Sequence, residues 1–167
     1  AMYAAKKSGR NTSRFYDASL QESMAEHARL THDLNAALTL HQLYIVYQEQ
    51  VNVQGVTEGV EALMRWEHPE RGSIPPSKFI PLAESSGIII SLGDWIFEEA
   101  TKQLKRWEND PIKQKWRISV NVSPKQFEEE NYIPKLKAQI NQMRINPSKI
   151  RLELTEGLLV HDIHKAM

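Results

Sequence analysis

The sequence lacks cysteine, long apolar runs and any excess of one charge. Without cysteine, disulfide bridges, thiolate metal ligands and thiol catalysis are excluded. No apolar stretch approaches the roughly 20 residues that span a membrane. Because 21 basic residues balance 21 acidic ones and no basic run carries interleaved aromatics, we expect no DNA or RNA partner, although a small dinucleotide would not need such a patch. A reducing cytoplasm fits these features, and a membrane anchor elsewhere in a longer parent protein would be compatible with them.

Strand-like and helix-like segments alternate along the 167 residues, a length that suits one domain. Helical periodicity predicts helices at residues 17–40, 77–85, 94–109 and 124–143, the last interrupted at Pro134. Alternation predicts strands at residues 43–53, 59–68, 117–123 and 149–155, the first two forming a hairpin, with a loop at residues 68–76. The order indicates βα units around a largely parallel sheet.

Several side chains are predicted to be structural. On the first helix, Leu20, Met24, Leu34 and Leu38 mark one apolar face. Core positions are expected for Trp66, Trp95 and Trp107. The six histidines show no metal-binding spacing, so we expect surface or loop positions for His27, His32, His41, His68, His161 and His164.

The strand around Glu61 carries charge where packing is expected. Its apolar face consists of Val60, Ala62, Met64 and Trp66. The opposite face carries Glu61, Leu63 and Arg65. Burial of an isolated charge is costly, so this face implies a metal, an anionic ligand or a mutual ion pair between Glu61 and Arg65.

Two later strands repeat this arrangement, with Asn121 and Glu153 on their polar faces. A parallel βα barrel would gather such residues at one end, where carboxylate and amide oxygens suit Mg²⁺ or Mn²⁺. Arg65 could then grip a phosphate. Plainer interpretations remain open, because Asn121 could cap a turn, and Glu153 with Glu156 could be a solvated pair at a helix start.

Ordered motifs across most of the chain resemble those of the EAL phosphodiesterase domain, which linearises the bacterial second messenger cyclic di-GMP. These motifs are Tyr47-Gln48, Glu61 to Trp66, Pro69 to Gly72, Phe79 to Glu84, Asn121 to Ser123 with Gln126-Phe127, and Glu153 to Glu156. The opening segment resembles the last helix of a GGDEF domain, the cyclase partner of many EAL domains. The expected organisation is therefore a GGDEF end at residues 1–16, an interdomain helix at 17–40, and the first half of an EAL domain at 41–167.

The resemblance implies an α/β fold, namely the first half of a variant (β/α)8 TIM-like barrel with an antiparallel first strand. It also implies that Mg²⁺ or Mn²⁺ activates the water that opens cyclic di-GMP to linear pGpG. By motif, the implied metal ligands are Glu61, Asn121 and Glu153, with Glu61 also catalytic. The implied substrate-binding residues are Gln48, Leu63 and Arg65. Glu156 matches a supporting catalytic acid that positions a neighbouring loop.

The sequence departs from the family pattern in three places. Glu49 stands where proline is usual, and Gly157 stands where serine is usual, but neither change removes a ligand. The sequence stops at Met167, before the family's paired aspartates and catalytic lysine, whereas a barrel needs about 250 residues. We therefore expect the 167 residues alone to be inactive and to associate as a homo-oligomer. The alternatives are a silent cyclic di-GMP receptor and a regulatory interaction domain.

Overall fold

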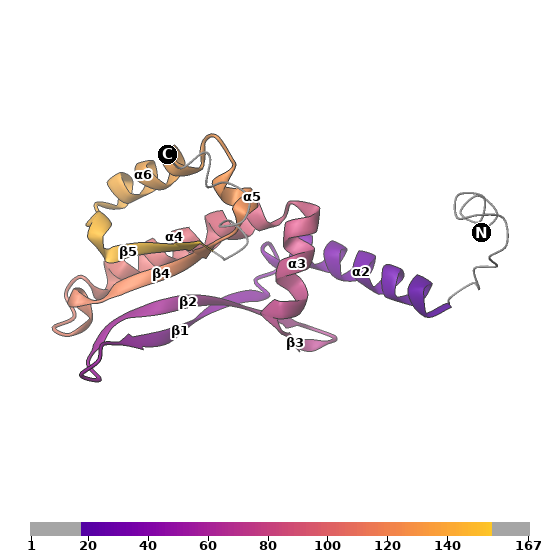
Figure 1. Ribbon diagram of the computed structural model, residues 1–167, viewed down its shortest axis with the longest axis horizontal. Helices are drawn as coiled ribbons and strands as arrows, with labels where there is room; N and C mark the ends of the chain where they lie inside the picture. The colour runs from indigo at the N-terminus through magenta and orange to yellow at the C-terminus, as the bar shows by residue number, and fades with distance from the viewer. Residues whose placement is uncertain (1–17, 155–167) are drawn as a thin grey trace.

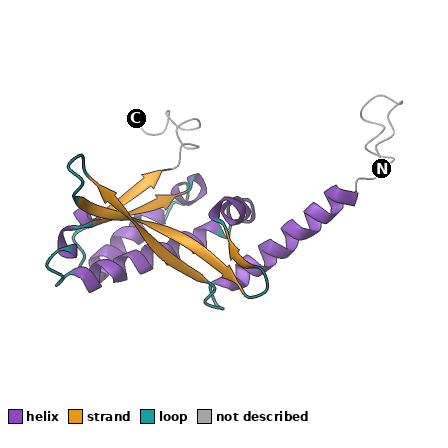
Figure 2. Cartoon of the chain, turned by 90° about the horizontal axis from the view of Figure 1, so that it is seen from below, coloured by secondary structure: helices purple, strands orange, loops and turns teal. Residues whose placement is uncertain are grey.

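The computed structural model describes residues 18–154, which form a curved sheet with helices on one side and a long helix projecting from it (Figures 1 and 2). The α-helices are α2 (Ala18–Ala37), α3 (Pro76–Ser86), α4 (Ile89–Trp107), α5 (Pro124–Phe127) and α6 (Tyr132–Met143). The strands are β1 (Leu43–Val51), β2 (Thr57–His68), β3 (Gly72–Ile74), β4 (Arg117–Val122) and β5 (Ile150–Leu154). Short 3₁₀ turns at Lys113–Lys115 and Pro147–Lys149 precede β4 and β5.

β1 and β2 form the predicted antiparallel hairpin, with Gln48 opposite Glu61. Asn52 and Gly55 build the turn between them. The Asn52 side-chain oxygen accepts hydrogen bonds from the N–H groups of Gln54 and Val56 at 3.0 Å each. Gly55 has φ 76°, a conformation that glycine adopts without steric cost. The hairpin is therefore confirmed, together with the local chemistry that closes it.

The sheet has the order β1-β2-β4-β5, in which β2, β4 and β5 run parallel and β1 runs antiparallel. This is the predicted α/β architecture with a reversed first strand. The segment 68–76, predicted as a loop, contains β3, which pairs antiparallel with the end of β2. Gly72, with φ 65°, turns the chain back so that Ile74 lies opposite Trp66. The proline and glycine residues of this segment therefore indicate a tight turn between two strands and not a long loop.

The apolar core lies between one face of the sheet and the covering helices. The predicted apolar face of β2 is confirmed, because Val60, Ala62, Met64 and Trp66 are all buried. Ile118 and Val120 of β4 join this cluster, and α3 and α4 contribute Phe79 and Leu92. Trp66 meets Phe79 edge to face at 5.9 Å between ring centroids. Trp66 is thus core as predicted, whereas Trp95 and Trp107 are only partly buried.

Two helix boundaries differ from the prediction. α4 begins at Ile89, two positions after Gly87 ends α3 in the left-handed conformation, so the helix is longer than residues 94–109 suggested. The 124–143 segment divides into α5 and α6 before Pro134. Pro134 lies in the first turn of α6, where its missing N–H is not needed, so it does not interrupt a helix.

Only the second half of α2 buries apolar side chains against the rest of the protein. Leu30, Leu34 and Ala37 are buried, whereas Leu20 and Met24 are 60% and 66% exposed, so the predicted apolar face is wrong for the first half of the helix. A helix longer than the surface beneath it leaves its apolar end uncovered. In the part of the chain described, no helix is long and apolar enough to cross a membrane.

Two polar contacts hold α2 against the β2–β3 connection. Arg71 pairs with Glu26 through both guanidinium nitrogens. His68 Nε2 lies 3.3 Å from Asp33 Oδ2, and His68 Nδ1 accepts the N–H groups of Glu70 and Arg71. His68 is only 7% exposed, so its predicted surface or loop position is wrong. The histidine is buried because both ring nitrogens have partners.

Candidate functional site

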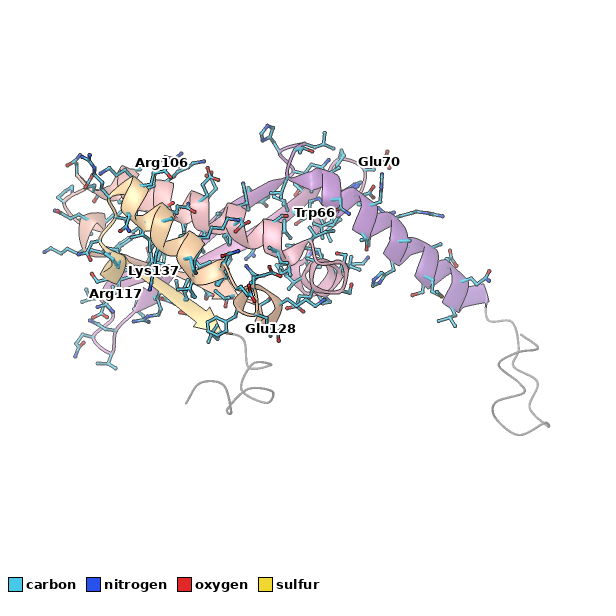
Figure 3. The ribbon with its side chains drawn as sticks, turned by 90° about the horizontal axis from the view of Figure 1, so that it is seen from above. Trp66, Glu70, Arg106, Arg117, Glu128 and Lys137 are labelled. Carbon is cyan, nitrogen blue, oxygen red and sulfur yellow. The ribbon has the colours of Figure 1, made fainter. Side chains whose placement is uncertain are left out.

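Polar side chains line the face of the sheet opposite the helices, which we call the inner face. Residues paired across a sheet share a face, so the register places Gln48 with Glu61, and Asn121 with Glu153. The three parallel strands also point the same way, so their carboxyl ends lie at one edge of the molecule. Figure 3 labels a residue near each end of β4: Arg117 lies at its start, and Glu128 lies beyond its carboxyl end.

Glu61 and Asn121 are in direct contact across β2 and β4. Asn121 Nδ2 donates a hydrogen bond of 2.6 Å to Glu61 Oε1. Asn121 is exposed, Glu61 is half-buried, and the two residues are 60 positions apart in the sequence. The sheet thus brings together two of the three residues that the sequence singled out as metal ligands.

Glu153 lies on β5, the next strand along, in register with Asn121. Its carboxylate does not join the Glu61–Asn121 pair through any hydrogen bond; it accepts one of 3.3 Å from Gln50 Nε2 on β1. The three predicted ligands therefore occupy neighbouring strands on one face, but only Glu61 and Asn121 touch. Glu156 lies outside the described residues.

The donor chemistry of this face fits a hard divalent cation. Two carboxylates and an amide offer only oxygen ligands, the type that Mg²⁺ and Mn²⁺ prefer. Half a turn of the Asn121 amide would present its oxygen in place of the nitrogen that now faces Glu61. Within residues 18–154 no cluster of three histidine, cysteine or acidic side chains is present, so an amide ligand is required for a three-ligand protein site on this face.

Arg65 and Leu63 follow Glu61 on the inner face of β2. The Arg65 guanidinium donates to the Met64 carbonyl at 2.9 Å and, among residues 18–154, forms no ion pair with Glu61. The plain interpretation of a mutual ion pair is therefore wrong. Leu63, Arg65 and Asn121 all line a largely apolar cavity of about 230 Å³ that reaches α3 and α4. A charged group beside an apolar cavity suits a ligand with both phosphate and ring surfaces.

The Tyr47-Gln48 pair divides between the two faces of β1. Gln48 is exposed and lies opposite Glu61 on the inner face. Tyr47 turns toward the helices and packs against Trp107, with ring centroids 5.7 Å apart. Burial raises the pKa of Tyr47 to about 12, so the hydroxyl stays protonated at ordinary pH. Gln48 is thus available to a ligand, whereas Tyr47 is structural.

The end of β4 is fixed by a side chain that sequence reasoning treated only as part of a motif. Gln126 Oε1 accepts the Ser123 N–H at 3.0 Å, and Gln126 is only 3% exposed. Its slot exists because Gly93 of α4 has no side chain. This arrangement ties α4 to the strand that carries Asn121.

Two further polar residues on the inner face, Gln50 and Ser119, were not singled out from the sequence. The Ser119 hydroxyl donates to Gln50 Oε1 at 3.1 Å, and Gln50 in turn contacts Glu153. The signal was available, because Gln50 follows Gln48 by two positions and Ser119 precedes Asn121 by two.

Comparison with known proteins places this sheet and its motifs in one family. The family model described as "EAL domain" matches residues 31–166. The bifunctional diguanylate cyclase/cyclic di-GMP phosphodiesterase MucR of Pseudomonas aeruginosa is 39% identical over 163 residues, which are 97% of this chain and 24% of MucR. The cyclic di-GMP phosphodiesterase PdeR of Escherichia coli is 34% identical over 167 residues, which are 100% of this chain and 25% of PdeR.

A solved structure of the MucR phosphodiesterase in complex with c-di-GMP is also similar. It superposes with a TM-score of 0.76 at 38% identity, over 80% of this chain and 54% of that one. The chain thus spans about a quarter of the curated relatives and about half of this structure. The barrel-like fold class is confirmed by this likeness.

Proposed function

Because the chain belongs to the EAL domain family, we propose that it supplies part of the active site of a metal-dependent phosphodiesterase that hydrolyses cyclic di-GMP to linear pGpG. The observation that carries this proposal is the Glu61–Asn121 contact on the inner face, with Glu153 on the adjoining strand. An acid, an amide and a second acid lie on the same face of three adjacent parallel strands. They are the oxygen donors that a cation at the strand ends requires.

In this proposal Glu61, Asn121 and Glu153 hold Mg²⁺ or Mn²⁺. A cation held by these residues would lower the pKa of the attacking water and neutralise charge on the phosphate. Glu61 is catalytic because it holds that cation and faces the open side of the sheet. Glu156 is proposed as the supporting acid from its motif alone.

Arg65, Leu63 and Gln48 are proposed to bind the substrate. The hydrogen bond from Arg65 to the Met64 carbonyl uses only Nη1, which leaves other donors of the guanidinium for a phosphate oxygen. Leu63 offers an apolar contact to a nucleobase at the mouth of the 230 Å³ cavity. Gln48, exposed beside Glu61, can donate and accept hydrogen bonds at the polar edge of the ligand.

The open edges of the sheet support the idea that this chain needs an additional polypeptide partner. Within residues 18–154, β1 and β5 each pair with one strand only, so both ends of the sheet path are open edges. Open edges favour pairing with another chain. We propose that the 167 residues alone form a homo-oligomer without turnover. We also propose a cytoplasmic location, with α2 as the helix that joins a GGDEF domain to this one.

The test is incubation of cyclic di-GMP with Mg²⁺ or Mn²⁺ and chromatographic detection of pGpG, for the protein as encoded and for the 167-residue chain. Glu61→Gln should abolish product, whereas Glu58→Gln, on the same strand but the opposite face, should leave it. Cyclic di-GMP binding without product in the encoded protein would refute hydrolysis and favour a silent receptor. Product from the 167-residue chain would refute its proposed inactivity.

A further inference from the structure

Gln50 connects three strands of the inner face. It lies at the end of β1, and its amide reaches Ser119 of β4 at 3.1 Å and Glu153 of β5 at 3.3 Å. The strand between, β2, presents Gly59 opposite Gln50. A Cβ at Gly59 would come within 2.6 Å of the Arg117 carbonyl oxygen, so this position has no room for a side chain. The long glutamine side chain can therefore extend over β2 to the two strands beyond.

The orientation of the Gln50 amide is determined by its partners. An ionised carboxylate only accepts hydrogen bonds, so the amide nitrogen of Gln50 must face Glu153. The amide oxygen then faces Ser119, whose hydroxyl donates to it. Ser119 is only 1% exposed, which holds this donor in place. The hydrogen bonds run in one direction, from Ser119 through Gln50 to one oxygen of Glu153.

We infer that Gln50 is a positioning residue that fixes the Glu153 carboxylate for metal binding. It holds Oε1 of Glu153, and among the described residues Oε2 forms no hydrogen bond. A carboxylate whose rotation is restricted loses less freedom when it binds a cation, so affinity rises. This inference depends on the proposed role of Glu153 as a metal ligand and adds a residue that holds that ligand in position.

The test is a titration of the encoded protein with Mn²⁺ alone, in which electron paramagnetic resonance measures the concentration of free Mn²⁺. Gln50→Met keeps the side-chain length but removes both hydrogen bonds, and should weaken Mn²⁺ binding by about tenfold or more. Ser119→Ala should weaken it in the same direction by less. The matched control is Gln139→Met, which removes a hydrogen bond of 3.0 Å to Thr101 on the helical side and should leave Mn²⁺ affinity unchanged.

The outcomes separate this inference from the proposed function. If wild-type protein binds no Mn²⁺, or Glu153→Gln binds it as wild type does, the metal role of Glu153 is wrong and the role of Gln50 falls with it. If Glu153→Gln weakens binding while Gln50→Met and Ser119→Ala do not, only the inference about Gln50 is refuted. Melting temperatures of Gln50→Met and Gln139→Met should match, because a difference in affinity without a difference in melting excludes a merely structural role.

Discussion

Gly93 of α4 provides a stability test whose sign depends on one neighbouring side chain. A Cβ built at Gly93 would overlap Gln126 Nε2 and lie 2.6 Å from Gln126 Cδ. Gln126 cannot move away without cost, since it is 3% exposed and accepts the Ser123 N–H at 3.0 Å. Gly93→Ala should therefore expel Gln126 from its slot and loosen the end of β4.

The expected magnitude combines two opposing effects. Leaving the Ser123 N–H without its partner costs about 1–3 kcal/mol, and forcing an extra methyl into a filled space costs a similar amount. Alanine in place of glycine within a helix gains about 1 kcal/mol. We expect Gly93→Ala to lower the free energy of unfolding by about 1–5 kcal/mol in the wild-type background.

The same substitution should stabilise a protein in which the slot is empty. In the Gln126→Ala background no side chain opposes the new methyl, so Gly93→Ala should raise the free energy of unfolding by about 0.5–1 kcal/mol. Urea unfolding of the four proteins in this double-mutant cycle measures both signs. Stabilisation by Gly93→Ala in both backgrounds would show that Gln126 does not depend on the missing side chain.

Two further predictions concern the contacts that dock α2 against the rest of the protein. Leu34 is fully buried, so Leu34→Ala should cost about 2–5 kcal/mol in urea unfolding, whereas Met24→Ala, at a site 66% exposed, should change stability by less than about 0.5 kcal/mol. Equal costs would refute the half-docked helix. The hydrogen bond from Arg71 lowers the pKa of Glu26 from its usual 4.5. Since the folded pKa is the lower one, the contribution of this pair is present above about pH 4.5 and lost as pH falls through the lowered value. Glu26→Gln should therefore differ from wild type in thermal stability at neutral pH and converge with it in acid, and a gap that persists in acid would contradict this.

The strands were predictable because alternation and turn chemistry are local signals. Together, the alternating apolar residues of β2 and the turn at Gly55 were enough to predict the β1–β2 hairpin correctly. The position of α2 was less predictable, because the spacing of Leu20 and Met24 says which face is apolar but not whether a surface lies beneath it. His68 was misjudged for a related reason, since its two partners, Asp33 and the following backbone, meet only in the folded chain.

The sequence predicted which residues lie on the face of the candidate site, but not the hydrogen bonds between them. Period-two alternation places Glu61, Asn121 and Glu153 on polar faces, and the structure brings the first two into contact. That Glu153 binds Gln50 depends on the sheet register and on the space at Gly59, which involve residues far apart in sequence. The metal-binding, catalytic and substrate-binding roles remain predictions.

The docking of α2 also links the helix to the strand that carries Glu61. From Glu26 to Ala37 the helix rests on its seat for about 18 Å, and residues 18–25 extend beyond it for about 12 Å, at 1.5 Å per residue. Five residues later, Gln42 accepts hydrogen bonds from the Trp66 indole at 3.2 Å and the Glu67 N–H at 2.9 Å. The docked end of the helix is thus connected, through Gln42, to the strand that carries Glu61.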